Sequence, residues 1–166
     1  MVSRILVAGI GNVFFGDDGF GVEVARRLGQ SPLPASVRVI DFGIRGLDLA
    51  YALLDGCEVA ILVDAVQRGC PAGTLFVMEP DLESLESQAT CSSGHTVDLG
   101  GTLHLARALG GRLPVLRLVG CEPADLGGEE GSMTLSAAVA AAVEPACSEV
   151  RTLVAEFLAE SPKETP

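Results

Sequence analysis

The fold class of this chain can be inferred from residues 4–28, RILVAGIGNVFFGDDGFGVEVARRL. It begins with an apolar run at 5–10, continues through a glycine-rich turn and ends in an amphipathic pattern at 19–28. An unbroken apolar run is typical of a strand that is covered on both faces, and the second pattern predicts a helix. A strand, a tight turn and a helix in this order indicate an α/β protein.

The rest of the chain repeats this alternation of apolar runs and helical patterns. We expect strands at 5–10, 37–42, 59–66, 75–78 and 115–120, and helices at 19–28, 47–54, 97–109 and 137–158, the last with Ser136 as its N-cap. The connection at 67–73 is too short for a crossover helix, so we expect the fourth strand to be antiparallel. The predicted fold is an α/β three-layer sandwich with helices on both faces of a mixed, mostly parallel five-stranded sheet.

Length and charge narrow the class of protein. The chain has 166 residues, which suits a single domain at 1–160 followed by a flexible tail at 161–166. Its net charge of −11 would repel a phosphate backbone, and no apolar segment approaches the roughly 20 residues of a membrane span. We therefore expect neither nucleic acid nor a membrane as a partner. The first residues lack the pattern of a secretory signal, which favours a cytoplasmic location.

The five cysteines are odd in number and widely scattered, without a C-x-x-C pair. This pattern disfavours a disulfide framework and a zinc knuckle. We expect them to be small, buried, reduced side chains. Cys91 is kept open as a functional candidate because it lies close to His95 in the sequence.

The glycine-rich turn has a dinucleotide-binding interpretation, which its own residues argue against. The fingerprint requires G-x-G-x-x-G, and Phe14 stands where the third glycine would follow Gly9 and Gly11. Asp17 and Asp18 would also repel a pyrophosphate at the start of the helix. An aspartate there is a good helix cap, so we expect Asp17 or Asp18 to cap this helix and the other to be free for a functional role. With Asp18 taken as the functional residue, Asp17 would support the helix start or the loop.

Other candidate site residues end strands or sit in turns. Asp64 interrupts an apolar run at the carboxyl end of a predicted central strand, where α/β proteins build their sites, and Asp41 ends the second strand in the same way, as a site residue or as a turn aspartate. His95 lies in a turn before a helical pattern, whereas His104 is expected to be a structural helix residue. Carboxylate and imidazole ligands from Asp18, Asp64 and His95 would suit a divalent metal with room for an external ligand.

Taken together, these residues resemble a known family, the maturation endopeptidases of nickel-iron hydrogenases. The similar features, in the same order over nearly the whole chain, are G-x-G-N at 9–12, the acidic pair with glycine at 17–21, Asp64-Ala65, His95, L-V-G at 118–120 and E-P-A at 144–146. The resemblance implies an α/β sandwich that removes a C-terminal extension from the precursor of the hydrogenase large subunit. The expected partner is this precursor, and the expected state of the protein is a monomer.

The resemblance also implies roles for individual residues. Asp18, Asp64 and His95 would be the nickel ligands and the catalytic residues, and the nickel would arrive on the substrate, held by its cysteines, rather than as a permanent cofactor. The family often has glutamate at the first position, so Asp18 is one methylene shorter. We favour hydrolysis positioned by the metal with Asp18 or Asp64 assisting, in a family classed as aspartic-type endopeptidases.

One segment departs from the family pattern. After the second strand the family commonly reads aspartate, a variable residue, glycine and threonine, and this chain keeps Asp41 and Gly43 but has Ile44 in place of the threonine. The resemblance makes Asp41 and Gly43 substrate-binding candidates, and Ile44 suggests a different class of hydrogenase as client. Two alternatives remain: a non-catalytic nickel-binding chaperone or adaptor with the same ligands, and a nucleotide-binding α/β module.

Overall fold

The computed structural model describes residues 4–84 and 99–160, and its centre is a five-stranded sheet. The strands are β1 (Ile5–Ile10), β2 (Val37–Gly43), β3 (Val59–Ala65), β4 (Leu75–Met78) and β5 (Val115–Cys121), in the spatial order β2-β1-β3-β5-β4. β2, β1, β3 and β5 run parallel, and β4 pairs antiparallel with β5. The predictions of an α/β fold, of a five-stranded mixed sheet and of an antiparallel fourth strand are confirmed.

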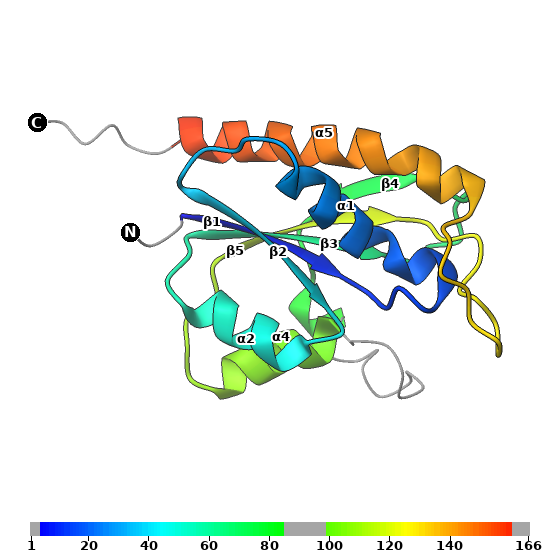
Figure 1. Ribbon diagram of the computed structural model, residues 1–166. Helices are drawn as coiled ribbons and strands as arrows, with labels where there is room; N and C mark the ends of the chain where they lie inside the picture. Colours follow the sequence, from blue (N-terminus) through cyan, green and yellow to red (C-terminus); the bar gives the residue numbers. More distant parts are fainter. Residues whose placement is uncertain (1–3, 85–98, 161–166) are drawn as a thin grey trace, which may run out of the picture.

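Helices cover both faces of this sheet (Figure 1). α1 (Phe20–Gly29) and α5 (Ala137–Ala159) pack on one face, and α2 (Gly46–Leu54) and α4 (Leu99–Ala108) pack on the other. Along β1, Ile5 and Val7 belong to the first core and Leu6 and Ala8 to the second. The unbroken apolar run in the sequence thus reflects a strand that is buried on both sides.

Glycines in the opening motif let α1 approach the sheet closely. A Cβ atom at Gly21 would lie 2.1 Å from the carbonyl oxygen of Val63, and one at Gly9 would lie 2.4 Å from that of Gly21. Any larger residue at either position would push the helix away from β1 and β3. The close packing fixes the start of α1, and with it the preceding 3-10 turn η1 (Gly16–Gly19), near the carboxyl ends of these strands.

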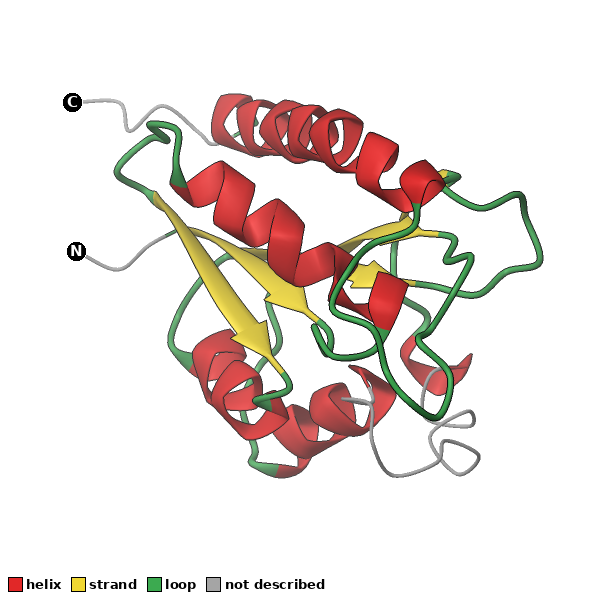
Figure 2. Cartoon of the chain, turned by 45° about the vertical axis from the view of Figure 1, so that its right-hand side comes forward, coloured by secondary structure: helices red, strands yellow, loops and turns green. Residues whose placement is uncertain are grey.

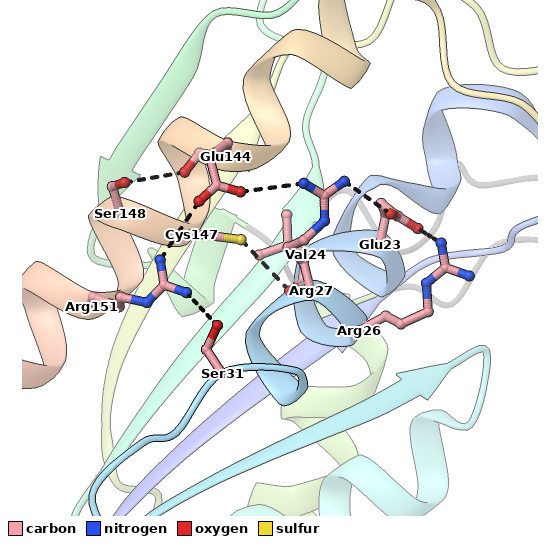
Figure 3. A network of polar contacts seen from close by, with 9 residues as sticks. All are labelled: Glu23, Val24, Arg26, Arg27, Ser31, Glu144, Cys147, Ser148 and Arg151. Atoms are coloured by element: carbon pink, nitrogen blue, oxygen red, sulfur yellow. Dashed lines mark hydrogen bonds and ion pairs between the residues drawn. The ribbon is translucent and has the colours of Figure 1, made fainter.

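Polar contacts join α1 to α5 across their exposed sides (Figure 3). Glu144 accepts a hydrogen bond from Arg27 at 3.3 Å and lies 3.8 Å from Arg151, which in turn donates to Ser31 at 3.3 Å. These groups are largely exposed, so each pair contributes little stability. The contacts of Glu144 therefore link the two helices only at the surface, and α5 continues through Pro145 without interruption.

The cysteines of the described residues are free, and their burial differs from the prediction at one position. Cys121 and Cys147 are buried as expected, and Cys57 is half-buried. Cys70 is exposed, so the expectation of burial was wrong there, because this residue lies in the connection between β3 and β4 rather than in a packed strand or helix. Cys91 lies outside the described residues. Over the described ranges, no helix is long and apolar enough to cross a membrane.

Candidate functional site

The candidate site lies at the carboxyl ends of the parallel strands. The connection from β1 to α1 and the loop from β5 to α5 meet on this side of the molecule (Figure 2). They are joined by hydrogen bonds from Ser132 N–H to the Phe14 carbonyl at 2.8 Å and from Gly16 N–H to the Ser132 carbonyl at 2.6 Å. In open α/β sheets this edge is where binding and catalytic sites are built.

Asp18 is held in the turn beyond β1 by the backbone. Its residue is only 8% exposed, and its carboxylate accepts a hydrogen bond of 2.9 Å from the Asn12 N–H. A Cβ atom at Gly11, where φ is +136°, would lie 1.8 Å from the Asp18 carbonyl oxygen, so this tight turn requires glycine. Burial raises the pKa of Asp18, and the Asn12 hydrogen bond opposes that rise.

Asp64 comes to the same place from β3. It lies one residue before the end of that strand, opposite Gly120 of β5. Loss of water around its carboxyl group, together with the nearby charge of Asp18, raises the pKa of Asp64 well above its ordinary value, although the Ala65 N–H opposes this rise. The structure therefore brings Asp18 and Asp64 together as an electrostatically coupled pair, in which a proton or a cation would relieve the repulsion.

Asp17 has a different role from its neighbour. It is fully buried and accepts hydrogen bonds from the N–H groups of Ala124 (2.8 Å), Asp125 (2.9 Å) and Ser136 (2.7 Å) and from the Ser136 hydroxyl (2.8 Å). Burial acts to raise the pKa of Asp17, and these hydrogen bonds outweigh it, so the pKa is lowered. Through these hydrogen bonds, Asp17 joins η1 to the loop that precedes α5.

The expectation that Asp17 or Asp18 caps α1 was wrong. The N-cap position of α1 is Gly19, and no side chain caps it. The reason is the intervening 3-10 turn, which moves both aspartates out of the cap position. Ser136 is the N-cap of α5, as predicted, and accepts a hydrogen bond from the Val139 N–H at 3.5 Å. Asp17 therefore supports the loop and, through Ser136, the start of a different helix.

Asp41 and Gly43 lie at the end of β2, on the same edge of the sheet. The Gly43 carbonyl, in a residue with φ +53°, accepts a hydrogen bond of 3.0 Å from Gly11 N–H, which joins this segment to the Asp18 turn. The guanidinium of Arg45 donates to the backbone carbonyl of Asp41, which leaves the exposed Asp41 side chain beside the site. Ile44, the departure from the family pattern, is 59% exposed next to it.

Glu122 is a buried carboxylate at this edge that sequence reasoning missed. It follows β5 directly, is 6% exposed, and accepts hydrogen bonds from the N–H groups of Arg68 at 2.7 Å and Gly69 at 3.2 Å. It therefore fixes the connection that follows β3, the strand that carries Asp64. The signal was available, because an acidic residue at a strand's carboxyl end is the rule that selected Asp64.

Four exposed apolar side chains belong to segments at this edge of the sheet. Phe14 (59% exposed) and Met133 (71%) come from the two joined loops, Ile44 comes from the connection between β2 and α2, and Leu47 (54%) comes from the first turn of α2. Apolar side chains that gather around polar groups mark surfaces that bind other molecules. This surface suits a polypeptide better than a small polar metabolite.

The third predicted ligand, His95, lies outside the described residues. Within 4–84 and 99–160, no group of three histidine, cysteine or acidic side chains comes together as a metal site. The structure thus brings together Asp18 and Asp64 of the predicted set. His104 lies on α4 with an exposed side chain, in keeping with its assignment to a helix.

Fold and site together define an α/β protein with a coupled carboxylate pair at the carboxyl edge of its sheet and an apolar surface around it. Comparison with known proteins identifies the class further. Residues 22–153 match the sequence model of the hydrogenase maturation protease family. The chain belongs to this family, and it is therefore a peptidase, a hydrolase of peptide bonds.

Individual relatives agree with this assignment. The hydrogenase expression/formation protein HupD of Rhodobacter capsulatus is 38% identical over 147 residues, which cover 88% of this chain and 69% of that protein. The hydrogenase maturating endopeptidase HybD from E. coli has a similar structure, with a TM-score of 0.78 and 30% identity over 93% of both chains. A hydrogenase 2 maturation peptidase from a Thaumarchaeota archaeon is 36% identical, with a TM-score of 0.69, over 92% of this chain and 98% of that one.

Proposed function

We propose that the protein is an endopeptidase that removes the C-terminal extension from the nickel-loaded large-subunit precursor of a nickel-iron hydrogenase, and so allows its maturation. The observation that carries this proposal is the coupling of Asp18 and Asp64 at the sheet edge of a chain in this protease family. The apolar surface around the pair supports a protein substrate.

Nickel enters this account as part of the substrate. The charge of Asp18 raises the pKa of Asp64, so the two carboxylates are poorly suited to being ionised together, and a divalent cation between them would offset that repulsion. Asp18 and Asp64 supply oxygen ligands, and His95 supplies an imidazole. Three protein ligands leave coordination positions on the nickel for groups of the precursor. The protease therefore binds the precursor productively only when the precursor carries nickel.

The same carboxylates assist the hydrolysis. When bound, the nickel of the substrate positions and polarises the scissile peptide group. Asp18 or Asp64 takes the proton of the attacking water as a general base, which is the sense in which we class the activity as aspartic-type. Asp17 and Glu122 act indirectly, because their hydrogen bonds are to the loops that hold the pair in place.

A cleavage assay with a matched control tests this function. The wild-type protein, Asp64→Asn and Glu156→Gln are incubated with the nickel-loaded precursor, and the mass of the large subunit is measured by mass spectrometry. Glu156 is an exposed carboxylate on α5, away from the candidate site, and serves as the control. We expect wild type and Glu156→Gln to shorten the precursor, and Asp64→Asn to lose at least about a hundredfold in rate, the usual scale for a general base. Full activity of Asp64→Asn would contradict the proposal.

The alternative of a non-catalytic nickel-binding chaperone makes a different forecast in the same assay. It requires the precursor to be bound but never shortened by the purified wild-type protein. Membership of a protease family and the coupled carboxylates both favour catalysis over this alternative.

A further inference from the structure

β2 is an edge strand whose outer side has no partner strand among the described residues. Ile5, which pairs with Val37, donates its N–H to the Ser36 carbonyl at 3.1 Å. Backbone groups alternate in direction along a strand, so those of Arg38 and Ile40 face β1. Those of Val37, Val39 and Asp41 consequently point outward.

The ends of this outward row are already used within the chain. The Val37 N–H donates to the Pro34 carbonyl at 2.9 Å, and the Asp41 carbonyl accepts from the Arg45 guanidinium. Val39, in the middle, presents both its N–H and its carbonyl to the outside. Such a row of groups is complementary to the backbone of an extended polypeptide and to little else.

A groove of about 430 Å³ accompanies this edge. Its walls come from one face of β2 and the outer side of α2, and its lining residues are Arg38, Ile40, Phe42, Tyr51, Ala52, Leu54 and Asp55. The middle of the groove is apolar, and Tyr51, 57% exposed, stands along its side. Alternate side chains of a strand added beside β2 would enter this groove.

The groove leads to the carboxylate pair. At the end of the groove near Phe42, the Gly43 carbonyl accepts a hydrogen bond from the Gly11 N–H. Asn12, which follows Gly11, donates its N–H to the Asp18 carboxylate. A chain lying along β2 therefore reaches the Asp18 turn without leaving the surface.

We propose that the C-terminal extension of the precursor docks along β2 as an additional strand, with its side chains in the groove against α2. This inference rests on the function proposed above. The scissile bond precedes the extension in the substrate and must lie at the carboxyl edge, whereas β2 runs toward that edge. The docked extension is therefore antiparallel to β2.

The geometry sets a length for the docked segment. Val37 to Asp41 spans about 13 Å, and a docked strand needs five extended residues to cover this length. From the docked strand, the chain must then cross β2 and β1 to reach Asp64 on β3. This crossing covers three strand spacings, about 14 Å, and takes about four more residues. Residues beyond roughly the ninth after the scissile bond lie past the groove, and their removal should leave binding unchanged.

The opposite edge of the sheet offers a matched control. The Cys121 carbonyl accepts from Val66 N–H at 2.9 Å, so Cys121 faces β3, and its β4 partner Leu75 faces outward. Val77, two residues on, does the same. Proline at an outward position of an edge strand removes no bond of the sheet, so Val39→Pro and Val77→Pro make the same backbone change on the two edges, although the Val39 side chain packs against the core and the Val77 side chain is 44% exposed.

The experiment compares wild type, Val39→Pro and Val77→Pro, each checked by circular dichroism. A synthetic peptide with the sequence of the precursor's extension is titrated calorimetrically, and cleavage of the nickel-loaded precursor is measured in parallel. We expect Val39→Pro to weaken peptide binding and raise KM by about tenfold or more with kcat little changed, since a bond is lost and the ring blocks strand addition. Val77→Pro should match wild type.

The two proposals fail in different ways. If wild type cleaves the precursor but Val39→Pro and Val77→Pro bind the peptide equally well, the docking proposal is overturned while the function stands. If wild type cleaves no nickel-loaded precursor, the proposed function is overturned, and the docking proposal with it. Should Val39→Pro not fold, Tyr51→Ala replaces it, with Val115→Ala, an exposed residue at the other end of the sheet, as its control. Unchanged peptide binding by Tyr51→Ala would then overturn the docking proposal.

Discussion

The charge of Asp18 raises the pKa of Asp64, although the two residues are far apart in sequence and come from different elements of the fold. Asp18 sits in a turn made possible by Gly11, and Asp64 sits at the end of a buried strand. Neither residue alone would indicate a reaction. Their proximity raises the proton affinity of Asp64, and it is the basis of the proposed cation site at this edge of the sheet.

Removing one member of this pair should be detectable at the other. Asp18→Asn is expected to lower the pKa of Asp64 while leaving it above the ordinary value, because burial, the larger cause, is retained. The measurement is a titration of the Asp64 carboxyl carbon by NMR. An Asp64 pKa that does not move in the variant would show that the two carboxylates are not coupled.

Asp64 should make the free energy of unfolding decrease as pH rises. A raised carboxyl pKa means that the folded state holds the proton more tightly than the unfolded state, so stability falls as pH rises from about 4 to above the folded pKa. Asp64→Asn removes this loss. The variant's gain in free energy of unfolding over wild type should therefore be larger at pH 7 than at pH 4, by urea titration. An equal difference at both values would contradict the raised pKa.

Asp17 should behave in the opposite way. Asp17→Ala leaves the N–H groups of Ala124, Asp125 and Ser136 without their acceptor, and we expect a loss of about 2–4 kcal/mol in the free energy of unfolding at pH 7. Because the pKa of Asp17 is lowered in the folded state, this stabilisation is present above about pH 4 and is lost as pH falls through the folded pKa.

The control for Asp17 is Asp125→Ala, which removes one exposed hydrogen bond to Gly127 N–H and should cost less than about 1 kcal/mol. Similar losses for the two variants would argue against the role of Asp17 as the anchor of the loop.

The close approach of α1 to the sheet can be tested with two glycines of the same helix. Gly21→Ala places a Cβ atom 2.1 Å from the Val63 carbonyl oxygen and should cost about 1–3 kcal/mol or more. Gly29→Ala meets nothing within 4 Å and should be neutral or stabilise by up to about 1 kcal/mol, since alanine favours the helix. Thermal unfolding of both variants gives the answer, and equal midpoints would contradict the packing described.

The sequence was sufficient for those features that depend on local pattern. Runs that are apolar on both faces predicted the buried strands, and the short connection at 67–73 predicted the antiparallel β4. Asp18 and Asp64 could be selected because strand ends in such sheets carry sites. The three-dimensional proximity of these two carboxylates, however, required the spatial order of β1 and β3.

Features that depend on contacts between residues far apart in the sequence could not be predicted from the sequence. The partners of Asp17 lie more than a hundred residues away in the sequence, so a capping role was the natural expectation, and the 3-10 turn that prevents it has no clear local signal. The groove beside β2 likewise depends on how α2 packs.

The proposed recognition of nickel on the substrate before cleavage can be measured with one precursor in two states. Wild-type protein is incubated with the nickel-loaded and the nickel-free large-subunit precursor, and the mass of each product is measured over time. We expect the nickel-loaded precursor to lose its C-terminal extension while the nickel-free precursor keeps it. Cleavage of both precursors at the same rate would contradict it.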